Sequence, residues 1–233
     1  MATAPNSRII SDYKAENRFR SEPYWTEEDD LSDEHKKLVE EVADIALTVV
    51  RRNADRYDAA AEFPAEDIEA LWRAGFLTAA LPERFGGRDY GIGGRDALAL
   101  YLIIETLARV SPATAHCFQI NAHTCRLLAD YADEAQMERY LAPLQERGAV
   151  FVGAGAEPGG GRQGTVAVNV PGGFRVTGQK HYATNATHAD WLMVVVRDPA
   201  LEDSRMLMIH RDNPGLRIDS SVWKPVGMRA CVS

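Results

Sequence analysis

Apolar residues recur at helical spacing from near the position of Ser32. The first stripe comprises Leu38, Val42, Ile45, Ala46 and Val49. It follows Ser32, whose hydroxyl suits an N-cap, and the acidic residues Asp33 and Glu34, which favour the positive end of a helix dipole. This pattern predicts a helix from Ser32 to about Tyr57.

Further helical patterns continue as far as Gly148, and they cover about residues 64–74, 97–110, 113–131 and 133–147. The second of these carries Ala97, Leu98, Tyr101, Ile104, Glu105 and Ala108 at helical spacing. Pro64 suits the first position of its helix, and Asp133 suits the N-cap of the last one. Glu105, an acid in an apolar helix, is interpreted as a structural residue with a partner rather than as a catalytic one.

After Gly148 the periodicity changes to that of strands. Short β-branched or aromatic runs lie at residues 150–152, 165–170, 173–177, 191–197, 205–210 and 216–220. Pro171-Gly172-Gly173 is expected to turn a hairpin, and the whole pattern is typical of an antiparallel sheet. The predicted fold class is therefore α+β: an arm over 1–30, a helical domain over 31–148 and a β domain over 149–233.

Composition narrows the classes of function. The 233 residues are 45% hydrophobic and 26% charged, with a net charge of −8 and no stripe of Lys and Arg, so a nucleic-acid partner is not expected. Three cysteines without C-x-x-C spacing argue against a disulfide framework or a zinc site and fit a reducing compartment. His116 and His123 lack the carboxylates of a metal site. No apolar run suits a membrane span or a signal peptide, and a cytoplasmic protein is expected.

The most informative segment is the polar turn at residues 178–190, which leads into the apolar run that starts at Trp191. Such a turn offers backbone N–H groups and a threonine hydroxyl to a ligand. A glycine-rich stretch, Glu157-Pro158-Gly159-Gly160-Gly161, precedes it and allows close approach of a cofactor. Each segment could also be only a turn.

Together these motifs resemble the acyl-CoA dehydrogenase family, over roughly residues 34–233. The resemblance includes Ala156 to Gly161, Gly178 to Asp190, Lys224 to Arg229, Phe63-Pro64, Trp72 to Leu77, Leu81 to Gly87 and Gln136 to Pro143. It rests on the order and spacing of the motifs, because no single one is decisive. It implies a helical N-terminal domain followed by a middle β domain that binds FAD.

The resemblance also implies a site. The residues expected to bind FAD are Gly155, Ala156, Gly161, Arg162, Tyr182, Ala183 and Thr184. In the family, the threonine hydrogen-bonds the flavin N5 edge and the aromatic residue flanks the ring. The sequence departs from the family pattern at Ala156, where a threonine is usual, and at Arg162-Gln163, where Ser-Asp is usual; the arginine could instead bind the diphosphate.

The implied reaction is FAD-dependent oxidation of an acyl thioester at its α and β carbons, in fatty acid metabolism, with an electron acceptor flavoprotein as possible partner. In the family a C-terminal helical domain supplies the base, and no residue here is assigned as catalytic. The chain is therefore expected to be inactive without such a domain and to form a homo-oligomer, or a hetero-oligomer with a chain that bears it. The alternatives are part of a flavin-dependent monooxygenase of the same fold, or a non-catalytic remnant or partner subunit.

Overall fold

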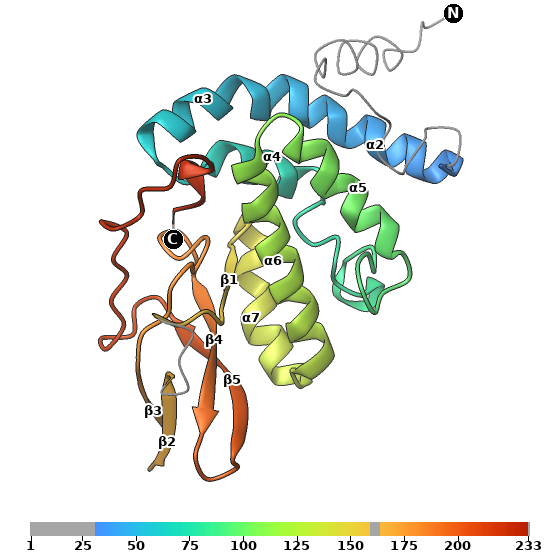
Figure 1. Cartoon of the computed structure of the whole chain (residues 1–233). Coiled ribbons are helices and arrows are strands. Elements are labelled where there is room, and N and C mark those ends of the chain that lie inside the picture. The colour runs from blue at the N-terminus through green and yellow to red at the C-terminus, as the bar shows by residue number, and fades with distance from the viewer. Residues whose placement is uncertain (1–30, 159–163, 233) are drawn as a thin grey trace, which may run out of the picture.

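The computed structural model describes residues 31–158 and 164–232, so the predicted arm, residues 1–30, lies outside them. Helices fill the N-terminal part and strands the C-terminal part, as Figure 1 shows. This arrangement confirms the α+β class. The domain boundary at Gly148 stays a prediction, because one continuous hydrophobic core contains buried residues from both parts.

The first helical stretch is longer and less regular than predicted. It consists of α2 (Asp33–Ile45), the π-helical η2 (Ala46–Val50) and α3 (Arg51–Ala60). Ser32 caps it as expected, since its hydroxyl accepts a hydrogen bond from the amide of His35. The buried residues Leu38, Val42, Ala46 and Val50 lie four apart. A π turn contains more residues than an α turn, so η2 keeps the last of them on the buried side.

The remaining helices agree with the predicted ones. They are α4 (Ala65–Arg73), α5 (Ala97–Ala108), α6 (Pro112–Tyr131) and α7 (Glu134–Arg147), with a short 3-10 turn, η3 (Glu83–Phe85), before α5. Asp133 and Gln136 form a capping box at the start of α7. Gly148 ends that helix in the left-handed conformation, with φ of 68°. Figure 1 shows α6 and α7 beside β1.

The helix α5 is mostly apolar, and its buried face differs from the stripe of Leu98, Tyr101 and Ile104 that the sequence pattern indicated. Leu98 and Tyr101 are exposed, whereas Leu100, Ile103 and Leu107 are buried. Glu105 accepts a hydrogen bond from Arg109, at 2.5 Å, as expected of a structural acid with a partner. Because the helix has little polar contrast between its faces, its packing partners select the buried face.

The sheet is mixed, which corrects the prediction of an antiparallel one. Its strands are β1 (Phe151–Ala154), β2 (Val166–Val170), β3 (Gly173–Thr177), β4 (Trp191–Asp198) and β5 (Asp203–His210), in the order β1-β4-β2-β3, with β5 paired to β4. The hairpins β2–β3 and β4–β5 are antiparallel. The pairs β1–β4 and β2–β4 are parallel. Alternation along a strand does not encode the direction of its partner, so the sequence pattern did not reveal this.

The strand predicted at residues 216–220 is also wrong, since this segment has no strand structure. Polar side chains in and just before it bond to the local backbone: Asp219 accepts from the amide of Ser221, and Asn213 from that of Gly215. Such bonds compete with strand pairing. The chain then reaches a short 3-10 helix, η5 (Arg229–Cys231), which packs against α3 and α6.

Candidate functional site

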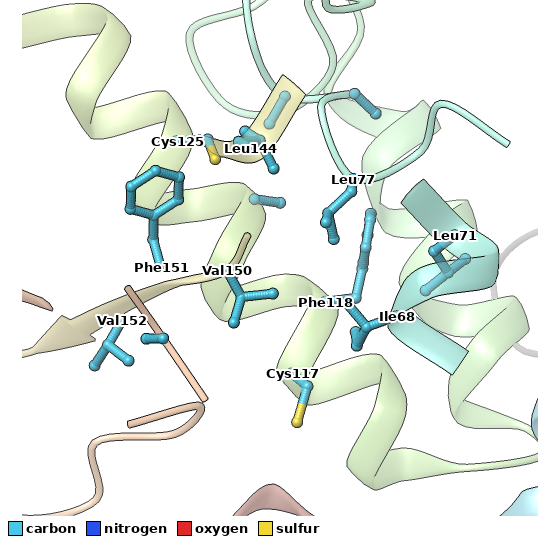
Figure 2. Packing of buried hydrophobic residues seen from close by; sticks show 14 of the residues in the cluster. Ile68, Leu71, Leu77, Cys117, Phe118, Cys125, Leu144, Val150, Phe151 and Val152 are labelled. Carbon is cyan, nitrogen blue, oxygen red and sulfur yellow. The ribbon is translucent and has the colours of Figure 1, made fainter. Parts of the chain in front are cut away.

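The segments that carry the candidate site meet around Phe151, the first residue of β1. The Oδ1 atom of Asn121, in α6, accepts the Phe151 amide at 2.9 Å. The Nδ2 atom of Asn185, in the loop before β4, donates to the Phe151 carbonyl at 3.3 Å and to the Cys117 carbonyl at 2.9 Å. Both asparagine side chains are fully buried. They therefore join the helical part to the loop that bears the candidate flavin residues. Figure 2 shows Phe151, Val150 and Val152 packed beside the helix that carries Phe118 and Cys125.

The loop that follows β1 is tied to the loop that follows β3. Lys180 donates from Nζ to the Gly155 carbonyl at 3.2 Å and to Oε1 of Glu157 at 2.5 Å. The His181 amide donates to the Ala156 carbonyl at 2.9 Å. These bonds bring Gly155 and Ala156 next to the segment that contains Tyr182.

A charged pair holds this junction. The hydrogen bond from Lys180, followed by that from the Thr165 amide, lowers the pKa of the Glu157 carboxyl. The Thr165 amide donates to Oε1 of Glu157 at 2.7 Å, so one carboxylate joins three segments of the chain. Close contact also explains Gly178, where a Cβ would lie 2.5 Å from the Cα of Thr165.

The three loop residues expected at the flavin ring differ in exposure. Tyr182 has a left-handed backbone, with φ of 55°, and its side chain is 73% exposed. Ala183 is half-buried, and Thr184 retains only 3% of its surface. The aromatic side chain is thus presented to solvent, while the threonine lies at the base of the loop.

The predicted residues Gly161 and Arg162 lie outside the described residues. Gly155 and Ala156 are exposed, and a Cβ at Gly155 would meet nothing closer than 3.9 Å. The backbone at 155 and 156 is therefore accessible from solvent. The structure thus brings together Gly155, Ala156 and Tyr182 on one surface.

The far end of the loop is fixed by arginines. Arg147, from the last turn of α7, forms a bidentate ion pair with Asp190, with distances of 2.6 and 3.2 Å. Arg211 donates to the carbonyls of Thr187 and Ala189. His188 stacks on Phe63 with ring centroids 4.4 Å apart. Burial is the main cause that lowers the pKa of His188, and the charge of Arg211 adds to it.

The sequence did not reveal the supporting roles of Asn121 and Arg147. It also did not reveal that Glu157 forms an ion pair with Lys180. An asparagine within an apolar helix, as at Asn121, was a usable signal, because a buried amide needs partners. Among residues 31–158 and 164–232, no group of three or more His, Cys, Asp and Glu residues could hold a metal ion. Over the same residues, no helix combines the length and the apolar character of a membrane span.

Comparisons with known proteins agree with the motifs. The family model of the acyl-CoA dehydrogenase N-terminal domain matches residues 32–147, and that of the middle domain matches residues 153–233. A putative acyl-CoA dehydrogenase of Bacillus subtilis, YdbM, is 29% identical over 206 residues, which are 85% of this chain and 52% of the relative. Cyclohex-1-ene-1-carbonyl-CoA dehydrogenase of Syntrophus aciditrophicus is 28% identical over 87% of this chain and 49% of its own length.

Solved structures share the fold. A chain from work on the electron transferring flavoprotein of Acidaminococcus fermentans superposes with a TM-score of 0.73 and 23% identity, over 86% of this chain and 53% of that one. Butyryl-CoA dehydrogenase from Megasphaera elsdenii gives 0.69 and 24%, over 80% and 50%. An FAD complex of PigA gives 0.69 and 21%, over 80% and 50%.

This chain spans about half the length of the curated relatives that it matches. The two family models follow one another along it in the same order as the helices and the strands. The matched residues, together with the α+β fold, show that the chain belongs to the acyl-CoA dehydrogenase family.

Proposed function

We propose that this chain is the flavin-binding portion of an FAD-dependent acyl-CoA dehydrogenase, which oxidises an acyl thioester between its α and β carbons in fatty acid metabolism. The observation that carries the proposal is the junction of two loops by Lys180 and Glu157, which presents Tyr182 beside Gly155 and Ala156. We propose two domains within the chain, a helical domain over 31–148 and a β domain over 149–233.

The described residues fit a flavin at this surface. Tyr182 offers an exposed aromatic face on which a ring can lie, and the small side chains at 155 and 156 leave room beside it. Ala183 lies next to Tyr182 at the edge of the same loop. Thr184 would contact the flavin only through the small part of its surface that is exposed. Gly161 and Arg162 complete the proposed set, toward the diphosphate.

Bound FAD would supply the hydride acceptor for the reaction. The residues of this chain would bind and orient it: Tyr182 would pack against the ring, and the 155–156 backbone would limit its position. We assign no catalytic base among the described residues. The base is proposed to lie on helices outside the 233 residues, either on the same polypeptide or on a partner chain, since the curated relatives are about twice as long. Alone, the chain would then be inactive.

The partners belong to the same proposal. Electrons would leave the flavin for an acceptor flavoprotein, and the protein would act in the cytoplasm as a homo-oligomer, or with a chain that bears the helical domain. The fold similarity to a chain from work on an electron transferring flavoprotein supports the choice of acceptor.

The test is a titration of the 233-residue protein with FAD, followed by flavin fluorescence. We expect Tyr182→Ala to weaken binding by roughly fivefold to tenfold, because it removes about 1 kcal/mol of ring contact. Tyr131→Ala is the matched control, since Tyr131 at the end of α6 is 74% exposed, as Tyr182 is 73% exposed. Equal affinity of wild type and Tyr182→Ala would refute the site.

The threonine has its own test. If a family C-terminal helical segment restores turnover, Thr184→Val should slow flavin reduction by roughly tenfold to a hundredfold, because a hydrogen bond to the reduced flavin is lost. Stopped-flow reduction at the wild-type rate, with FAD bound, would exclude Thr184 from the flavin edge.

The alternatives give different outcomes in that reconstituted system. A flavin-dependent monooxygenase would consume oxygen with an amine, sulfur or aromatic substrate. The departures from the family pattern at Ala156 and at Arg162-Gln163 are the features that favour it. A non-catalytic partner subunit would bind the helical chain without any turnover. The curated relatives named above are dehydrogenases, which favours the first proposal.

A further inference from the structure

Two of the three cysteines lie together where the C-terminal turn meets α6. Cys117, in α6, is fully buried, and Cys231, in η5, is 1% exposed. The Cys231 thiol donates to the Ala113 carbonyl at 3.7 Å. In an α-helix that carbonyl is the acceptor for the amide four residues later, which is that of Cys117. The sulfur of Cys231 therefore lies beside the helical turn that carries Cys117.

The neighbouring thiols influence each other's ionisation: Cys117 lowers the pKa of Cys231, while burial, followed by the neighbouring Cys231, raises the pKa of Cys117. Asn185 bonds to the backbones of both cysteines. Its side-chain Nδ2 donates to the Cys117 carbonyl, and its backbone amide donates to the Cys231 carbonyl at 3.4 Å. One residue thus maintains the juxtaposition of the two cysteines.

The third cysteine is a natural control. Figure 2 shows the Cys117 sulfur directed away from Phe118 and Val150, whereas Cys125 lies farther along the helix near Leu144. Burial raises the pKa of Cys125 to about 12 and also raises that of Cys117, but Cys125 lies eight residues farther along α6 than Cys117, whose turn Cys231 contacts. Cys125 is therefore not expected to react.

We propose that Cys117 and Cys231 form a redox-responsive pair that closes into an intramolecular disulfide when the protein meets a peroxide, and that this bond fixes the C-terminal turn to α6. The Cys231 thiolate attacks one peroxide oxygen and breaks the O–O bond, which leaves a sulfenic acid and releases hydroxide. The Cys117 sulfur then attacks the Cys231 sulfur, and hydroxide leaves. It forms water with the Cys117 proton. The two thiols lose two electrons in all, and the peroxide is reduced to water.

Access to Cys231 depends on local opening of η5. This short helix is tied down by the Arg229 amide, which donates to Oδ1 of Asp58 at 2.9 Å, and by Trp223, whose Nε1 donates to the Arg229 carbonyl at 2.9 Å. The backbone amide of Asn185 also donates to the Cys231 carbonyl, and opening of the turn must break these bonds and uncover Ala230 and Cys231, while the helices and the sheet stay folded.

The experiment treats the 233-residue protein with hydrogen peroxide, blocks the remaining thiols with iodoacetamide and maps the peptides by mass spectrometry. We expect a peptide pair cross-linked through Cys117 and Cys231, and a melting temperature raised by roughly 5 to 10 °C, because the bond closes a long loop. Dithiothreitol should reverse both changes.

Variants separate the proposal from general oxidation. Cys125→Ser should keep the cross-link and the thermal shift, whereas Cys231→Ser should lose both. If the buried hydroxyl of Cys231→Ser impairs folding, Cys231→Ala is used in place of Cys231→Ser. The peptide map of the wild-type protein tests the cross-link without any variant. Free thiols at both positions after treatment, or a cross-link that includes Cys125 or a second chain, would overturn the proposal.

Discussion

At the scale of single residues, buried amides connect parts of the chain that are distant in sequence. Asn121 accepts the amide of Phe151 and Asn185 donates to its carbonyl. Strand β1 lies at the end of the strand order, so the backbone groups on its outer side need partners from outside the sheet. Asn185 also has one cost: its Oδ1 is buried and has no partner among the described residues.

Asn185→Ala is expected to lower the free energy of unfolding by about 1 to 3 kcal/mol, because it removes the buried side-chain bonds to the Cys117 and Phe151 carbonyls. The midpoint of urea unfolding measures this. Asn213→Ala is the matched control: Asn213 is exposed, and its side chain accepts the Gly215 amide. Equal losses in the two variants would show that the buried bonds of Asn185 add nothing to the free energy of unfolding beyond what an exposed bond adds.

The ion pair of Lys180 and Glu157 predicts a pH dependence. The pKa of Glu157 is below its ordinary value of 4.5, chiefly because of the hydrogen bond from Lys180, so the unfolded chain binds the proton more tightly. The stabilisation is complete above pH 4.5 and is lost as the pH falls through the lowered pKa.

Urea midpoints measured at stepwise lower pH test this dependence. Lys180→Gln should make the acid limb shallower than in the wild type. Arg73→Gln should leave it unchanged, because Arg73 and Glu69 form a surface pair on one helix, with exposed side chains. An acid limb that is the same with and without Lys180 would contradict the assignment.

At the scale of elements, the chain uses its helix ends and glycines to set angles between segments. Gly148 ends α7 in the left-handed conformation, and a Cβ there would lie 2.8 Å from the ring of Trp72. Helix α7 thereby stops where β1 must start, and Arg147 in its last turn can reach Asp190. The end of this helix thus positions the candidate loop.

Gly148→Ala is expected to destabilise the protein by roughly 1 to 3 kcal/mol more than Gly172→Ala. Both glycines have positive φ, 68° and 83°, so both variants carry the same backbone strain. A Cβ at Gly172 meets nothing within 4 Å, so only Gly148→Ala must also displace Trp72. Thermal or urea unfolding measures the difference, and no difference would mean that the Trp72 ring moves freely.

At the scale of the whole molecule, large apolar side chains are exposed in both parts of the chain, as at Ile92 and Tyr131 in the helical part. Tyr182, Val222 and Val226 are 73%, 79% and 105% exposed. The chain also spans about half the length of its curated relatives. The proposed further helices are expected to cover the face of the flavin that Tyr182 does not contact.

The purified 233-residue chain is expected to retain FAD at well below one molecule per chain and to show no turnover of an acyl-CoA with an electron acceptor. The reason is that a half-covered ligand loses much of its apolar contact. Flavin absorbance and a dye-reduction assay measure this. Near-stoichiometric flavin, or turnover by this chain alone, would refute the proposed need for a further helical domain.

The sequence by itself determined the elements and the family. Periodicity, caps such as Ser32 and Asp133, and the turn at Pro171 to Gly173 depend on neighbours within a few residues, so they can be read locally. The order of the motifs gave the family. The candidate loops were found for the same reason, since each is a contiguous stretch.

Only the tertiary structure decided how these pieces meet. Strand direction, the buried face of α5, and the partners of Asn185 depend on residues that lie far away in the sequence. A predicted strand at residues 216–220 failed because side chains bond their own backbone there, which no periodicity reports. Tyr182 and Thr184 are close neighbours in the sequence, yet packing exposes one and buries the other. Local pattern fixes what an element is, whereas long-range contact free energy fixes where it packs.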